Sequence, residues 1–225
     1  MLVFVLFCGR TLCAQDIHFS QYNGSLLNAN PAFTGFFDGD YRFGGIYRSQ
    51  WQSVPVSYST FSAFGDTRLN MKKNKSDVVG IGVLFNNDKA GYANYAINQL
   101  YLSTSYIHKL NADSTWLWST GLTAGYSNLA FNYNKMTFDN QYDGNRYSSS
   151  LSTGENFAAT STSYMDVSAG TLLKYHFRQR AYIQYGITYN HINTPRITYQ
   201  NNASVKIDPK IYNYLSFQYP LAPTV

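Results

Sequence analysis

Side chains alternate between two kinds along residues 165–177, and this alternation constrains the fold more than any other feature of the sequence. One face carries Met165, Val167, Ala169, Thr171, Leu173, Tyr175 and Phe177, and the other carries Asp166, Ser168, Gly170, Lys174 and His176, with Leu172 as the exception. A period of two places successive side chains on opposite faces of a β-strand, whereas a helix would repeat every 3.6 residues. The stretch is therefore predicted to be a strand with one apolar and one polar face.

The same period recurs along the chain. It predicts eight strands, at residues 41–50, 57–69, 78–87, 94–110, 115–131, 165–177, 181–189 and 208–219. Most of them are longer than the roughly five or six residues usual in soluble proteins. With no composition shift or linker to divide the chain, the predicted fold is a single all-β, antiparallel domain.

The polar face of these strands decides between two environments. It consists of Ser, Thr, Asn, Gln and Gly, and only 13% of the chain is charged, against about 25% in an average soluble domain. A soluble β-sandwich or a lipocalin-like barrel would also alternate, but usually carries more charge toward solvent. A membrane can be crossed by strands of about ten residues that close into a barrel. The composition, with 21 Tyr and 15 Phe, favours a transmembrane outer-membrane β-barrel in contact with lipid.

The lengths of the connections predict the orientation of this barrel. From the fourth connection onward they alternate between short and long, and the two long ones span residues 132–163 and 191–207. Outer-membrane barrels have short periplasmic turns and longer extracellular loops. Both long loops are therefore expected outside the cell.

The N-terminal residues divide the chain into three predicted parts. Residues 1–14 are apolar, too short to span a bilayer, and predicted to be a signal peptide cleaved after Ala14. Both cysteines, Cys8 and Cys13, lie inside it, so the mature chain has no thiol chemistry. Residues 15–40 hold too many apolar side chains for a disordered tail and are expected to pack in the periplasmic mouth or the lumen. Residues 41–225 form the barrel.

No constellation of residues predicts catalysis, a metal or a cofactor. The four histidines lie far apart in the sequence, without metal-ligand spacing, and no Gly-x-Ser-x-Gly motif occurs. Ser168 and His176 share the polar face with Asp166, which keeps an outer-membrane hydrolase open as a hypothesis. The net charge of +5 is spread along the chain, so no nucleic-acid partner is predicted.

Three stretches of the mature chain resemble one known family. They are QDIHFSQYNGSLLNANPAFTGFFDGDYRFGGIYRSQW from residue 15, YSTFSAFGDTRL from residue 58, and GIGVLFNNDKAGYANYAINQLYLSTSYIHKL from residue 80. They are similar to the PorP/SprF outer-membrane proteins of Bacteroidota, and the resemblance covers essentially the whole mature chain. The positions that carry these motifs, with no role assigned, are Asn30, Pro31, Gly35, Arg48, Trp51, Asp88 and Lys89; the last two are expected in a turn.

The resemblance implies a function. It predicts a non-enzymatic outer-membrane component of the type IX secretion system and its gliding machinery. The implied partners are secreted or surface adhesin cargo and other secretion-system components in the periplasm. The polar inner face leaves a second function open, a porin-like diffusion channel for small solutes.

The length of the chain departs from the family. Members carry several further strands, whereas this sequence stops after the eighth candidate strand. The chain is therefore expected to be truncated at its C-terminus and to form an incomplete portion of a larger barrel. A complete narrow barrel of eight strands is the alternative.

Overall fold

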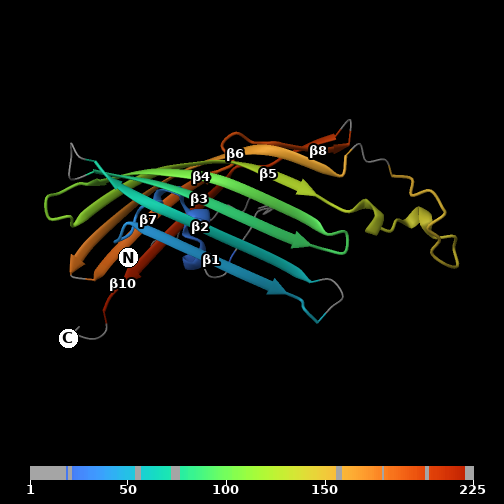
Figure 1. The fold of residues 1–225 in the computed structure, drawn as a ribbon, viewed down its shortest axis with the longest axis horizontal. Helices are drawn as coiled ribbons and strands as arrows, with labels where there is room; N and C mark the ends of the chain where they lie inside the picture. The colour runs from blue at the N-terminus through green and yellow to red at the C-terminus, as the bar shows by residue number, and fades with distance from the viewer. Residues whose placement is uncertain are drawn as a thin grey trace, which may run out of the picture.

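A computed structural model describes residues 19, 22–53, 57–71, 77–155, 159–178, 180–200 and 203–220. Most of them form one antiparallel sheet in the order β1-β2-β3-β4-β5-β6-β7-β10 (Figure 1). Its strands are β1 (Tyr41–Gln50), β2 (Tyr58–Asn70), β3 (Asp77–Ala90), β4 (Tyr95–Lys109), β5 (Trp116–Ala130), β6 (Ser161–Arg178), β7 (Ala181–Asn190) and β10 (Lys210–Gln218). The predicted fold class is confirmed, and each predicted strand coincides with one of these eight. The predicted signal peptide lies outside the described residues.

Two details differ from the prediction. β3 runs to Ala90, so Asp88 and Lys89 end a strand rather than form a turn. The ladder continues because Asn87 still pairs with Asn98, whose side-chain oxygen accepts a hydrogen bond of 2.6 Å. The second long loop is also partly ordered, because β8 (Arg196–Gln200) and β9 (Ala203–Lys206) pair as a hairpin within it.

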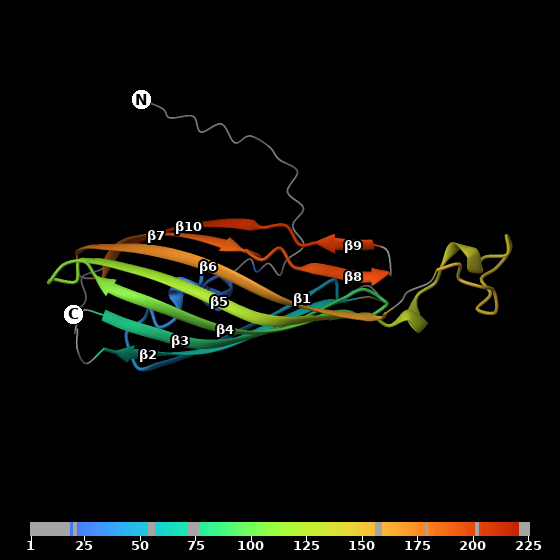
Figure 2. The ribbon, with the colours of Figure 1, turned by 90° about the horizontal axis from the view of Figure 1, so that it is seen from above.

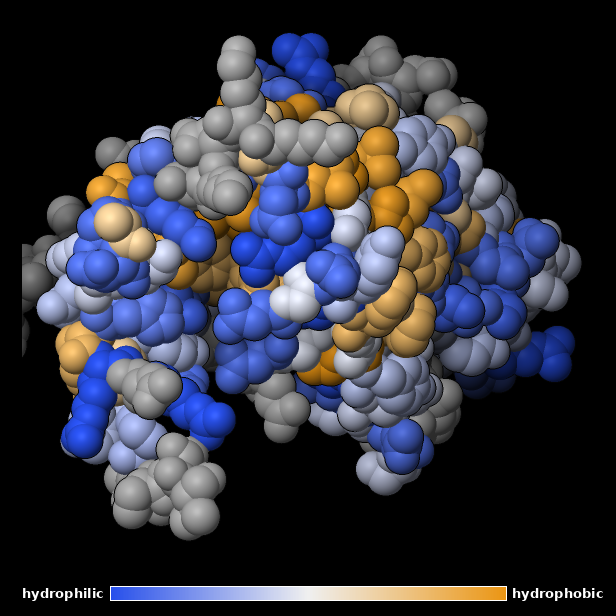
Figure 3. Space-filling view, turned by 60° about the vertical axis from the view of Figure 1, so that its left-hand side comes forward, coloured by the Kyte–Doolittle hydropathy of each residue, from blue (hydrophilic) through white to orange (hydrophobic). Residues whose placement is uncertain are grey.

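The two faces of the sheet differ as the alternation predicts. The outer face exposes apolar side chains, among them Phe43 at 82%, Leu102 at 66% and Leu215 at 68%. Figure 3 shows apolar residues reaching the surface beside polar ones. The inner face buries small polar residues, namely Thr60, Ser62, Asn86, Gln99, Ser103, Ser119, Thr123, Ser127, Ser168 and Thr188. This is the arrangement of a barrel wall with lipid outside and a polar interior.

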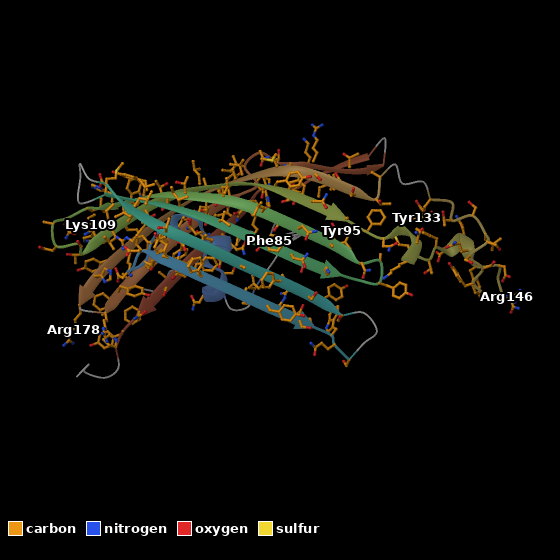
Figure 4. All side chains as sticks on the ribbon, in the orientation of Figure 1. Phe85, Tyr95, Lys109, Tyr133, Arg146 and Arg178 are labelled. Atoms are coloured by element: carbon orange, nitrogen blue, oxygen red, sulfur yellow. The ribbon has the colours of Figure 1, made fainter. Side chains whose placement is uncertain are left out.

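The connections collect at two ends of the sheet. Short connections lie at the end marked by Lys109 and Arg178, here called the turn end (Figure 4). At the opposite end, the loop end, residues 131–155 project beyond the strands as an arm that carries Tyr133 and Arg146. The β8–β9 hairpin lies toward the loop end as well (Figure 2). Both long connections therefore share one end, as the alternating lengths predict.

The sheet is curved, and a segment that precedes β1 lies against its concave face (Figures 1 and 2). This segment contains three short helices, η1 (Tyr22–Ser25), α1 (Leu26–Ala29) and η2 (Pro31–Phe33). Phe19 and residues 22–38 are together called the inner segment below. Within the described ranges, β1 and β10 form the two edges of the sheet and do not pair with each other. No helix in those ranges is long and apolar enough to cross a membrane. The division of the chain at residue 40 stays a prediction.

Candidate functional site

The inner segment is the most deeply buried part of the structure, although much of its surroundings is polar. The side chains of Asn30, Ala32 and Thr34 are 0% exposed. Buried polar groups are costly unless hydrogen-bonded, so a polar wall needs matching partners. The segment supplies them along most of its length.

Both the nitrogen and the oxygen of the Asn30 side-chain amide make hydrogen bonds. Its Nδ2 donates to the backbone carbonyls of Thr171 on β6, at 3.0 Å, and Ile187 on β7, at 3.2 Å. Its Oδ1 accepts from the backbone N–H of Ala32 at 2.8 Å, which caps the η2 helix that Pro31 begins. One side chain thus starts the helix and fastens it to two strands.

Glycines in the wall let this helix approach the strand backbones. A Cβ on Gly121 of β5 would lie 2.5 Å from the carbonyl carbon of Pro31, closer than real atoms come. A Cβ on Gly170 of β6 would overlap the Asn30 amide, and one on Gly80 of β3 would overlap the carbonyl of Thr34. These three glycines, on three strands, form a shallow seat into which residues 30–34 fit.

Serine and threonine side chains complete the seat. Ser119 donates to the carbonyl of Ala32 at 2.7 Å, and Ser105 donates to the carbonyl of Thr34. The hydroxyls of Thr34 and Ser103 are 2.6 Å apart, and Thr188 donates to the carbonyl of Ala29 at 2.9 Å. Backbone carbonyls that the short helices leave unpaired therefore bond to the wall.

Gly35, the last family-motif residue of the inner segment, is hydrogen-bonded to a carboxylate that forms an ion pair. Its φ of +66° belongs to the left-handed region that favours glycine. Its N–H donates to Asp66 Oδ2 at 2.7 Å, and the same carboxylate receives two bonds from Arg42, at 2.7 and 3.0 Å. Arg42 also donates to the carbonyl of Phe33 at 2.8 Å. Asp66 is 5% exposed, and the pair joins the inner segment to β1 and β2.

A polar network holds the part of the segment before Asn30. The Asn28 amide donates to Ser25, to Ser62 of β2 and to Asn86 of β3, at 2.6, 3.0 and 3.0 Å. Asn86 donates back to Asn28 at 2.9 Å and onward to Gln99 of β4 at 3.1 Å. Every amide in this group thus has a partner.

Two apolar clusters flank the polar contacts. Leu27 packs with Phe64, Leu84 and Tyr101. Ala32 and Phe33 pack with Leu172 and Tyr214, with the rings of Phe33 and Tyr214 edge to face at 5.4 Å. Leu172, the exception in the alternation of β6, therefore faces the interior because the inner segment brings apolar side chains to it.

Motif residues also meet near the loop end. Arg48 of β1 donates to Thr60 Oγ1 at 3.3 Å, and Thr60 donates to Asp88 Oδ1 at 2.5 Å. The guanidinium carbon of Arg48 lies 6.0 Å from the ring centre of Phe19, which is buried. Arg48 and Asp88 thus belong to one group that faces the start of the inner segment.

The other two motif residues lie elsewhere. Trp51 follows β1, is 64% exposed and packs edge to face with Tyr58 at 4.9 Å. Lys89 is exposed near the end of β3. Neither contacts the inner segment among the contacts described here, and Trp51 has the position of an aromatic side chain at a membrane interface.

A buried carboxylate–imidazole pair is present. Asp166 accepts from the hydroxyl of Tyr101 at 3.1 Å and lies 3.0 Å from His191 Nδ1. These residues line a cavity of about 40 Å³ beside the inner segment. A space of that size suits a few water molecules rather than a substrate.

The two residues of the hydrolase hypothesis are far apart. Ser168 and His176 lie on the same strand, eight residues apart, which is about 26 Å along an extended chain. Nor do the described residues contain a group of three or more His, Cys, Asp or Glu side chains placed to hold a metal ion.

The family comparison agrees with this architecture. The family model described as type IX secretion system membrane protein PorP/SprF matches residues 12–223. The chain belongs to the PorP/SprF family. No curated protein and no solved structure matches the chain. As a PorP/SprF protein it is a membrane component of the type IX secretion system, and its strand-rich fold with an apolar outer face places it in the outer membrane.

Several residues of this PorP/SprF protein that hold the inner segment were not found from the sequence. Asp66, Asn86, Ser103 and Ser119 looked like ordinary polar positions of a strand. A signal did exist, because Asp66 is a charged residue on the inward face of β2, although the sequence also places Arg68 two residues farther along the same face. Arg42, the partner of Asp66, lies 24 positions away, and only the pairing of β1 with β2 brings the two together.

Proposed function

We propose that this PorP/SprF protein acts without enzymatic chemistry, as an outer-membrane scaffold for type IX secretion and gliding. It would support the export or surface retention of adhesins and other cargo through protein contacts. Other secretion components on the periplasmic side are its second class of partner.

The observation that carries this proposal is the occupied inner face. Residues 25–35 cover the polar wall from β2 to β7 with buried hydrogen bonds. A wall built to bind a segment of the same chain favours a closed interior. The surfaces left for partners are then the connections at the two ends.

The arm at the loop end has the composition of a protein-binding surface. Tyr142, Tyr147 and Leu151 are exposed on it, between serines, asparagines and glycines. Tyr gives a rigid contact area and Ser, Gly and Asn give adaptable hydrogen bonds, as in antibody loops. The backbone of Ser148 donates to Gln141 at 2.8 Å, which folds the arm back on itself.

The test is to delete the gene in its native host and compare surface and secreted proteins by mass spectrometry. Loss of an adhesin or of a set of secreted proteins, restored by the wild-type gene, supports the proposal and names the cargo. A variant without arm residues 136–152 should lose the same proteins while still reaching the outer membrane. An unchanged surface proteome in the deletion strain contradicts the proposal.

The polar character of the inner wall is the observation that favours a diffusion channel instead. Conductance of the purified protein in planar bilayers separates the two functions. An occupied interior predicts no steady conductance for the wild type. Steady channels with the inner segment in place would favour the porin-like function.

A further inference from the structure

The inner segment has a direction, which follows from the level at which each of its residues meets the strands. β1 and β3 both end at the loop end, at Gln50 and Ala90, and β2 ends at the turn end, at Asn70. Position along these strands therefore measures depth in the barrel interior.

The first described residue lies near the loop end. Phe19 lies beside Arg48, two residues before the end of β1. Arg48 is linked through Thr60 to Asp88, two residues before the end of β3. Phe19 therefore lies at the level of the last few residues of β1 and β3, next to the loop end.

The following residues lie progressively deeper. Asn28 bonds to Asn86, four residues before the end of β3, whereas the carbonyl of Thr34 meets Gly80, ten residues before it. Farther on, Arg68, two residues before the end of β2, donates to the carbonyl of Phe37. The backbone N–H of Arg68 donates to the carbonyl of Asp40 at 3.3 Å, and β1 starts at the next residue.

We propose that the inner segment threads the barrel interior lengthwise, from the loop end to the turn end, before the first strand begins. Because long loops of outer-membrane barrels face outward, the start of the segment is presented at the outer mouth.

This placement rests on the outer-membrane location and on loop length, and not on a role in secretion. If the segment before the first strand stayed in the periplasm, its start would lie on the periplasmic side. The threading places that start at the outer mouth instead. A labelling experiment can therefore test the placement even if the proposed function fails.

The experiment uses single cysteines, since the chain has none after Cys13. Asn23→Cys and Asp38→Cys replace two exposed residues at opposite ends of the inner segment. Asn145→Cys at the tip of the arm and Asp113→Cys in a turn-end connection serve as references. Intact cells of the native host are treated with a bulky, membrane-impermeant maleimide, and then again after the outer membrane has been permeabilised.

We expect Asn23→Cys to be labelled in intact cells to the same extent as Asn145→Cys. Asp38→Cys should react, like Asp113→Cys, only after permeabilisation, with at least a tenfold difference between the two conditions. Labelling of Asp38→Cys but not Asn23→Cys in intact cells would overturn the proposal. Failure of Asn23→Cys to react in intact cells would overturn it as well.

A second variant covers the possibility that Asn23→Cys fails to fold. Asn23→Lys, treated with an impermeant amine reagent and read by peptide mass spectrometry, reports the same position. The inserted lysine should be modified in intact cells, and its protection there contradicts the threading.

Discussion

The side-chain amide of Asn30 occupies the space that a side chain at position 170 would need. The asparagine comes from a segment ahead of the first strand, and the glycine lies in the middle of β6. Gly170 leaves the space that the Asn30 amide fills. The concave face of the sheet is therefore complementary in shape to the inner segment.

A side chain added at one of the three seat glycines should prevent the inner segment from packing against the strands. We expect Gly121→Ala to displace the inner segment, because its Cβ would lie 2.5 Å from Pro31. Overpacking of this kind costs about 1–3 kcal/mol. The measurement is the rate of proteolysis within residues 22–38 of the folded protein in detergent. Gly45→Ala, on the outer face, is the control and should leave that rate unchanged.

Asn30 should not tolerate a change of charge. Asn30→Asp keeps the shape but points a carboxylate at the carbonyls of Thr171 and Ile187 and loses both donated bonds. The carboxylate keeps the bond from the N–H of Ala32, but a buried charge that faces two carbonyl oxygens should cost about 3 kcal/mol or more. The temperature at which the barrel loses its compact gel mobility should fall, whereas Asn134→Asp in the arm should not change it. Equal stability of the two variants would show that Asn30 is not a fastening residue.

A disulfide should form between the inner segment and β2. The hydroxyl oxygens of Ser25 and Ser62 are 3.1 Å apart, which is near enough for Ser25→Cys and Ser62→Cys together to cross-link. Electrophoresis with and without reductant detects the bond, and each single variant is the control. If cargo is held by outer surfaces, the locked protein should support secretion like the wild type. Secretion that returns only after reduction would mean that the interior has to open.

The outer face should penalise charge according to depth. Leu102→Arg, at the centre of β4, should destabilise folding in lipid vesicles by about 2–4 kcal/mol, as expected at a bilayer midplane. Leu110→Arg, just beyond the end of the same strand, should cost no more than about 1 kcal/mol. Similar losses at both positions would contradict the assignment of this face to lipid.

The turn at the tip of the arm should depend on pH. The Asp143 carboxylate accepts from the backbone N–H groups of Arg146 and Asn145, at 2.7 and 2.8 Å, and these bonds lower the pKa of Asp143 below its usual value. A lowered pKa in the folded state means that the turn is favoured above the usual carboxyl pKa and loses this support as the pH falls through the lowered value.

Carbon NMR of the labelled carboxyl groups in micelles should therefore show Asp143 titrating below the usual range of an aspartate side chain. In Asp143→Asn, where an acceptor oxygen remains without a charge, the amide shifts of residues 145 and 146 should no longer depend on acidic pH. An Asp143 carboxyl that titrates in the usual range would show that the turn is open in solution.

The strands were predictable because their signal is local. Alternation along β6 and β7 needs only neighbouring residues, and the burial of Asp166 and exposure of Met165 follow it. The seat was not predictable, because its hydrogen bonds join residues up to 159 positions apart, as between Ala29 and Thr188. Glycines in the strands indicated close approach of some backbone, but no local pattern indicates which one. The β8–β9 hairpin was missed because its two strands have only five and four residues, so the alternation of Ile197 and Tyr199 with polar neighbours is too short to stand out in a long polar connection.

The distance in sequence between the inner segment and its seat has a consequence for assembly. The segment is made before any strand of the sheet, and Thr171 and Ile187, which Asn30 binds, are made more than a hundred residues later. Contacts of such separation form late, since the long intervening loop must be closed first. The segment therefore waits unpaired until β6 and β7 have formed. Docking of the segment through Asn30 therefore requires that β6 and β7 are already correctly paired in the wall of the barrel.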